Sequence, residues 1–116
     1  MKKLLVVLGV ILLVGCESIT LKDKNISTQS SEEVNLVDAG AIWERCASCH
    51  GKNGEVGALG VSEPIGGDDW EVTLEKLQAY KRGALNQYGF GELMKSQVAN
   101  FSDLELEALA KYIQNL

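Results

Sequence analysis

Cys46-Ala47-Ser48-Cys49-His50 is the stretch of this 116-residue sequence that decides the fold. Its Cys-x-x-Cys-His pattern is the one to which a c-type haem is attached. Each thiol can form a thioether with one vinyl group of the same porphyrin, and the imidazole of the next residue can ligate the iron. His50 is the only histidine in the chain, so the motif predicts a covalent haem whose iron the His50 imidazole can ligate.

Two other sites use a Cys-x-x-Cys pair. A redox dithiol of the thioredoxin type lies in a βαβ context, and no strand is predicted before Cys46. A structural zinc site needs four ligands, but the only other cysteine is Cys16 and there is no second histidine. Haem attachment is therefore favoured over zinc binding and dithiol chemistry.

The N-terminus resembles the leader of a bacterial lipoprotein. Met1-Lys2-Lys3 is followed by an apolar run from Leu4 to Val14, which is too short to span a bilayer and suits a secretory signal. The run ends in Leu13-Val14-Gly15-Cys16, similar to a lipobox, which implies cleavage before Cys16 and lipid on its sulfur. The alternative is an ordinary cleaved leader that happens to contain a cysteine. We expect a signal peptide over residues 1–15.

The segment after Cys16 has a different composition. Residues 16–36 include the polar run Ser27–Glu33 and show no helical or strand period, which predicts a flexible tether. The remaining residues, 37–116, form one small domain. Without the leader's two lysines, nine basic residues stand against 16 acidic ones, so the formal charge is −7. This charge argues against nucleic acid as a partner.

The domain is predicted to be all helical. Residues 37–47 form a first helix that ends in the haem motif, and the last helix begins after Ser102. Residues 51–67 contain six of the 12 glycines and the only proline, Pro64, which predicts a loop. No segment alternates apolar and polar residues for long enough to predict a strand.

Helix ends are signalled by capping residues. Asp68 and Glu71 have the spacing of a capping box, so a second helix is expected to open near Asp68 or Asp69 and to stop at Gly83. Ser102 and Glu105 form a second capping box. Phe101 and Leu106 sit at the positions of the hydrophobic staple that accompanies it.

Met94 is the candidate for the second iron ligand. It is the only methionine besides the initiator, and it follows a turn-rich stretch, Tyr88-Gly89-Phe90-Gly91. A thioether opposite the histidine raises the reduction potential and leaves the iron no free position for substrate. The alternative is that Met94 only fills the core.

Residues 38–116 resemble the small bacterial class I monohaem cytochromes c. The resemblance rests on the haem motif, Pro64, Met94, Phe101-Ser102-Asp103 and Ala110-Lys111-Tyr112-Ile113, in that order. It implies the all-α class I cytochrome c fold around one covalent haem c, with Cys46 and Cys49 as thioether residues. It also implies axial ligation by His50 and by a loop methionine, Met94.

The same resemblance implies further contacts. The Pro64 carbonyl would accept a hydrogen bond from the imidazole of His50, which orients a metal-binding histidine. The first and last helices would cross at Ala39 or Gly40 against Tyr112. Three aromatic residues are candidates for hydrogen bonds to the haem propionates or for ordinary core packing: Trp70, Tyr80 and Tyr88.

We therefore expect an electron carrier rather than an enzyme, a monomer anchored by lipid in the bacterial periplasm. Its partners would be a redox donor and acceptor, with quinol–cytochrome c oxidoreductase and a terminal oxidase or reductase as candidates. Two alternatives remain: an open-site haem enzyme or gas sensor in which Met94 does not bind, and a haem subunit of a larger oxidoreductase.

Overall fold

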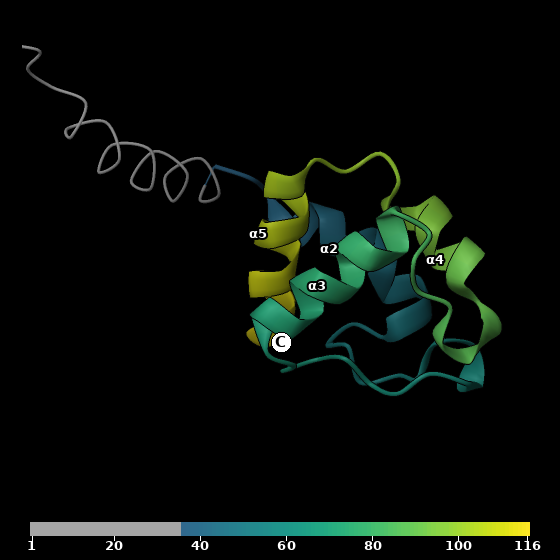
Figure 1. Ribbon diagram of the computed structural model, residues 1–116. Coiled ribbons are helices and arrows are strands. Elements are labelled where there is room, and N and C mark those ends of the chain that lie inside the picture. The colour runs from purple at the N-terminus through teal and green to yellow at the C-terminus, as the bar shows by residue number, and fades with distance from the viewer. Residues whose placement is uncertain (1–35) are drawn as a thin grey trace, which may run out of the picture.

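The computed structural model describes residues 36–116, and within that range every regular element is a helix. Figure 1 shows α5 lying against α2, with α3 across them, α4 on the far side of α3 and a long loop closing the lower edge. The all-α fold is confirmed. The elements, in chain order, are α2 (Ala39–His50), a 3₁₀ turn (Ala58–Gly60), α3 (Trp70–Lys81), a 3₁₀ turn (Gln87–Gly89), α4 (Gly91–Val98) and α5 (Asp103–Gln114).

The leader, Cys16 and nearly all of the tether lie outside the described residues. The described helices each have 12 residues or fewer, and none of them is long and apolar enough to cross a membrane.

Helix α2 carries the entire haem motif. Asp38 caps its start by accepting a hydrogen bond from the backbone N–H of Ala41 at 3.0 Å. The helix continues through His50, beyond the predicted end at residue 47. It stops at Gly51, whose φ of 83° is a left-handed conformation that glycine adopts without strain. Cys46 and Cys49 are consequently three residues apart on a regular helix.

Helix α3 starts where it was predicted, at one of the two candidate residues, Asp68 or Asp69. Asp69 is the N-cap, and its side chain accepts hydrogen bonds from the N–H groups of Glu71 and Val72 at 3.0 and 3.1 Å. The predicted Asp68–Glu71 capping box is therefore wrong, because a cap at Asp69 makes Glu71 the second helical residue rather than the third. The predicted stop is confirmed, since Gly83 has a φ of 71°.

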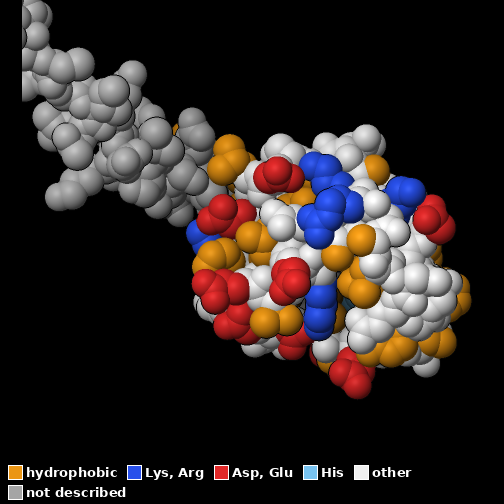
Figure 2. Space-filling view, in the orientation of Figure 1, with side chains coloured by type: hydrophobic (Ala, Val, Ile, Leu, Met, Phe, Trp, Pro, Cys, Tyr) orange, Lys and Arg blue, Asp and Glu red, His pale blue; other side chains and the backbone are white. Residues whose placement is uncertain are grey.

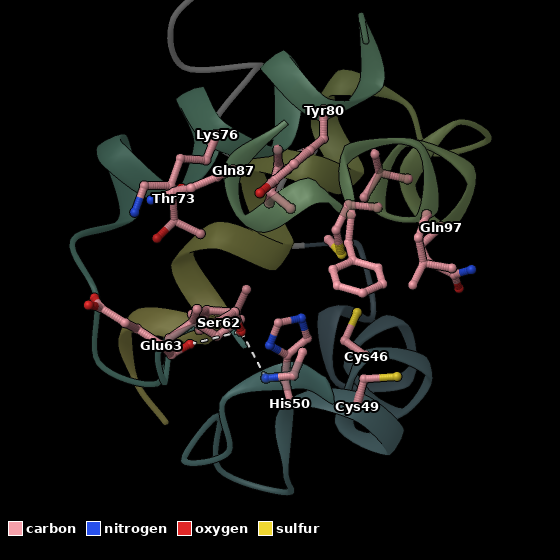
Figure 3. A pocket seen from close by; sticks show the side chains of 18 of the residues that line it. Cys46, Cys49, His50, Ser62, Glu63, Thr73, Lys76, Tyr80, Gln87 and Gln97 are labelled. Atoms are coloured by element: carbon pink, nitrogen blue, oxygen red, sulfur yellow. Dashed lines mark hydrogen bonds between the residues drawn. The ribbon is translucent and has the colours of Figure 1, made fainter. Parts of the chain in front are cut away.

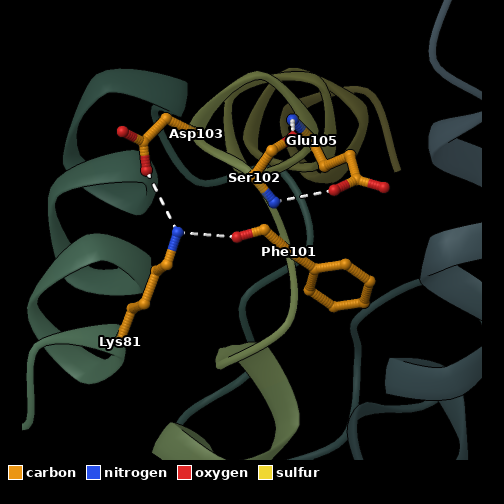
Figure 4. Close-up of polar contacts among 5 residues, drawn as sticks. All are labelled: Lys81, Phe101, Ser102, Asp103 and Glu105. Carbon is orange, nitrogen blue, oxygen red and sulfur yellow. Dashed lines mark hydrogen bonds and ion pairs between the residues drawn. The ribbon is translucent and has the colours of Figure 1, made fainter.

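Helix α5 begins with the predicted capping box. The Ser102 side chain accepts from the N–H of Glu105, and the Glu105 carboxylate accepts from the N–H of Ser102 at 2.7 Å. Lys81, the last residue of α3, donates to the carbonyl of Phe101 at 2.7 Å and pairs with Asp103 at 3.3 Å (Figure 4). Lys81 thus fastens the end of α3 to the connection between α4 and α5.

The hydrophobic core is built on α5. Leu106, Leu109 and Ile113 are at most 1% exposed, and Trp43 of α2 and Leu77 of α3 close over them. A core of this size is small even for a domain of about 80 residues, which commonly needs a further source of stability.

The predicted crossing of the first and last helices is confirmed at Gly40. A Cβ placed on Gly40 would lie 3.7 Å from the ring of Tyr112. This is an ordinary packing distance, and the small residue allows α2 to lie close to α5.

Candidate haem site

A cavity of about 300 Å³ lies between the helices and the loop 51–69. It falls at the lower end of the range for cofactor sites, about 300–1,000 Å³. All four helices contribute to its wall, which is mostly apolar. The apolar residues lining it include Trp43, Leu59, Val61, Ile65, Leu77, Phe90, Leu93, Val98, Leu109 and Ile113.

The three motif residues meet at this cavity. Cys46 is half-buried and Cys49 is exposed, and both carry free thiols. Residues three apart share a face of a helix, so both sulfurs lie along one rim of the cavity. His50 is 9% exposed and its ring points into the cavity beside the cysteines (Figure 3).

The buried surroundings change the proton affinity of two motif residues. Burial raises the pKa of the Cys46 thiol, an effect opposed by the guanidinium of Arg45 and reinforced by Cys49. Burial lowers the pKa of His50 below its ordinary value, so the imidazole is neutral at pH 7 and can bind a metal ion.

The imidazole of His50 also has an unsatisfied atom. Among residues 36–116 its Nδ1 is buried and has no hydrogen-bond partner. Buried polar groups are nearly always hydrogen-bonded, so this nitrogen calls for a specific explanation. Pro64 lines the same cavity, but the hydrogen bond between its carbonyl and His50 stays a prediction.

Met94 lines the cavity from α4, where it is half-buried against the core. The expectation that it lies in a loop is wrong, because residues Gly91–Val98 are helical. The Asn86 side chain accepts from the N–H of Gly91 at 2.8 Å, which satisfies one donor at the start of this short helix. The structure thus brings His50 and Met94, 44 positions apart in the chain, to the wall of one cavity.

The three aromatic candidates have different places. Trp70 packs against the core and lies 4.8 Å beneath the ammonium group of Lys111, away from the cavity lining, which favours the packing role. Tyr80 and Tyr88 do line the cavity. Burial raises the pKa of Tyr80, and the nearby Tyr88 raises it further. Tyr88 has a φ of 63°, an uncommon conformation for a non-glycine residue.

Thr73, Lys76 and Gln87 are among the polar residues of the cavity wall that sequence reasoning missed. For Thr73 and Lys76 the signal was their helical spacing with Leu77 and Tyr80, which places them on the face of α3 that carries the core contact of Leu77. Gln87 lies in the 3₁₀ turn Gln87–Gly89, and no local pattern indicated its place.

These features define a small class I monohaem cytochrome c. A mostly apolar cavity holds two free thiols, a neutral histidine with an orphaned nitrogen and a methionine, a donor set that fits haem. Comparison with known proteins agrees. A family model described as "Cytochrome C oxidase, cbb3-type, subunit III" matches residues 39–113, and the chain belongs to this family of c-type cytochromes.

Curated relatives carry cytochrome names. Cytochrome c-553 of Nitratidesulfovibrio vulgaris is 34% identical over 82 residues, covering 68% of this chain and 76% of the relative. Cytochrome c-553 of Helicobacter pylori strain J99 is 37% identical over 79 residues, covering 68% and 78%. Cytochrome c4 of Azotobacter vinelandii is 26% identical over 99 residues, and the chain spans about half of its length, 47%.

The chain is therefore an electron-carrying c-type cytochrome with covalently bound haem c and redox proteins as partners. The haem supplies reversible one-electron chemistry at its iron.

Proposed function

We propose that this protein is a lipid-anchored cytochrome c that passes single electrons between respiratory redox proteins on the periplasmic side of a bacterial membrane. Cys46 and Cys49 hold the haem through thioethers, His50 is the proximal ligand and Met94 the distal ligand. The observation that carries the proposal is the convergence of the only histidine and the only internal methionine on one apolar cavity.

The residues around the ligands suit electron transfer better than catalysis. With His50 and Met94 both as ligands, the iron of a bound haem would have no position left for a substrate. Apolar walls formed by Leu77, Leu109 and Ile113 would limit the access of water to a bound haem. Since a thioether favours the reduced iron, this environment favours a high reduction potential.

The rim of the cavity offers a surface for a redox partner. Tyr88, Phe90 and Leu93 are 43, 42 and 44% exposed although they line the cavity. In Figure 2, acidic side chains gather on the side of α5, whereas the side of α4 is mainly orange and white. We assign partner docking to this apolar rim, where a small transient interface suffices.

The proposed organisation along the chain is a leader over residues 1–15, a lipidated Cys16 with a tether to residue 36, and the cytochrome domain from 37 to 116. A flexible tether of twenty residues has a root-mean-square reach of about 25 Å. The anchor would keep the domain close to membrane-bound partners and raise their effective concentration.

Replacing Met94 with alanine tests the electron-carrier proposal. Loss of the thioether should abolish the near-infrared sulfur-to-iron band of the oxidised protein. It should also lower the reduction potential by more than about 0.1 V, equivalent to about 2.3 kcal/mol for one electron. Leu93→Ala is the matched control on the same helix and should keep the band.

Three results would contradict the proposal. If Met94→Ala retained the band and the potential, Met94 would be core filler. If the unmodified protein bound carbon monoxide rapidly, the iron would have an open position, as in a haem enzyme or gas sensor. A stable stoichiometric complex purified from membranes would instead indicate a subunit of a larger oxidoreductase.

The anchor is tested by Cys16→Ser in the full chain. Haem-containing protein should move from the membrane fraction to the soluble fraction, whereas the control Ser18→Ala should stay with the membranes. Retention of the Cys16→Ser protein in the membrane fraction would contradict lipidation at this residue.

A further inference from the structure

One wall of the cavity is polar although most of the lining is apolar. Thr73 and Lys76 reach it from α3, and Gln87 reaches it from the 3₁₀ turn before α4. Thr73 is only 7% exposed and is one of two buried polar residues among those described. Burying a hydroxyl in an apolar wall is unfavourable without a hydrogen-bond partner.

These side chains lie together and away from the cysteines. Thr73 and Lys76 are three residues apart, so they share one face of α3. Figure 3 shows them grouped with Gln87 on one side of His50, while Cys46 and Cys49 lie on its other side. The cavity thus has a thiol rim and, across the histidine, a polar wall that holds these hydrogen-bonding side chains and also the carboxylate of Glu63.

The positions of the vinyl and propionate groups on haem explain why one wall of the cavity is polar. The two vinyl groups that form thioethers are on one half of the porphyrin, and the two propionate carboxylates are on the opposite half. A haem attached at the thiol rim therefore directs its propionates to the wall across from the cysteines. A carboxylate entering an apolar cavity needs charged or hydrogen-bonding partners there.

We propose that Lys76, together with Thr73 and Gln87, binds a haem propionate. The inference rests on the thioether attachment at Cys46 and Cys49 proposed above.

Charge supports the choice of Lys76. The described cavity lining has two basic residues, and the other is Arg45, which lies beside Cys46 and 5.1 Å over the ring of Phe101. Lys76 is thus the cation that faces the propionate side. Glu63 and Asp68 also line the cavity, and their negative charges would repel a propionate. The ammonium group of Lys76 offsets that repulsion.

The test uses holoprotein with Lys76→Gln, read by the propionate bending band in the resonance Raman spectrum. We expect this band to shift and the reduction potential to fall, because a positive charge near the haem stabilises its reduced form. Lys111→Gln is the charge-matched control. Lys111 pairs with Glu107 at 2.6 Å and does not line the cavity, so its variant should leave the band unchanged.

A second pair of variants isolates the hydroxyl. Thr73→Val keeps the shape of the side chain but removes the hydroxyl donor, so it should shift the propionate band. Thr73→Ser keeps the hydroxyl and should leave the band at its wild-type position. An unchanged band in Lys76→Gln, or an equal shift in Lys111→Gln, would overturn the inference.

The near-infrared sulfur-to-iron band is recorded on the same samples. If this band were absent from the unmodified protein, ligation by Met94 would be contradicted. The inference about Lys76 would still stand or fall on the propionate band, which is read independently of the axial ligand.

Discussion

Lys81 should stabilise the domain by fastening the segment that carries Met94. Its ammonium group joins the end of α3 to the carbonyl of Phe101, immediately before α5, at 2.7 Å. It also pairs with Asp103 at 3.3 Å (Figure 4). We predict that Lys81→Met destabilises the holoprotein and loosens the chain that follows α4.

The magnitude follows from the two contacts. A hydrogen bond to a charged group contributes about 1.5–3 kcal/mol, and the Lys81 side chain is 31% exposed, which favours the lower half of that range. The pair with Asp103 adds about 0–1 kcal/mol, since Asp103 is 79% exposed. We therefore expect Lys81→Met to lower the free energy of unfolding by about 2 kcal/mol.

Urea unfolding followed by circular dichroism measures this change, and the sulfur-to-iron band is recorded along the same titration. Asp103→Asn is the control, because it removes the ion pair while Lys81 still reaches the carbonyl of Phe101. It should cost no more than about 1 kcal/mol. In Lys81→Met the band should disappear at a lower urea concentration than in the control. Equal stability of the two variants would refute the contribution assigned to the Phe101 carbonyl.

Three other substitutions have defined outcomes. Gly91→Ala should destabilise α4 by about 1–3 kcal/mol, because the added methyl group would overlap the carbonyl oxygen of Leu85, and wild-type urea stability would contradict this. Gly40→Ala should be neutral or stabilising by up to about 1 kcal/mol, since its methyl group meets only ordinary contacts and alanine favours helix; a large loss of stability would refute it. Hydrogen bonds from Ser102 lower the pKa of Glu105. A lowered carboxyl pKa stabilises the fold above the ordinary glutamate value of about 4.3, and this stabilisation is lost as pH falls through the lowered pKa. The stability difference between wild type and Glu105→Gln should therefore be largest at neutral pH and shrink as the pH falls through the lowered pKa of Glu105, and a difference constant with pH would contradict it.

Local signals predicted those features that depend on neighbours in the chain. The Ser102–Glu105 capping box is formed because both partners lie within one helical turn. The stop at Gly83 likewise needs only a left-handed residue at that position. The haem motif gave the two thiols and the histidine by spacing alone.

The start of α3 depended on distant contacts. Asp68 and Asp69 are equally good cap residues, and the spacing to Glu71 favoured Asp68, which is not the cap. The N–H of Gly67 donates to the carbonyl of Ile113 at 2.9 Å, and the N–H of Trp70 donates to the Gln114 side chain at 3.0 Å. These bonds to α5 fix where the chain enters the helix, and Asp69 becomes the cap.

Helix α4 was missed for a related reason. It has eight residues and no side-chain cap at Phe90, and a helix this short is not stable by itself in water. Packing against α3 and the hydrogen bond from Gly91 to Asn86 supply what the local sequence lacks. A segment with glycines at 89 and 91 therefore reads as a turn until its neighbours are known.

The sequence by itself determined which atoms are available for chemistry: two thiols spaced for one porphyrin, one imidazole and one thioether. These follow from residue identity and short-range spacing. Only the tertiary structure decided that His50 and Met94 line the same cavity, and that Thr73 and Lys76 face it across from the cysteines. The physical reason is that such convergence depends on how α2, α3 and α4 pack around α5, and packing between distant segments is not encoded in any local pattern.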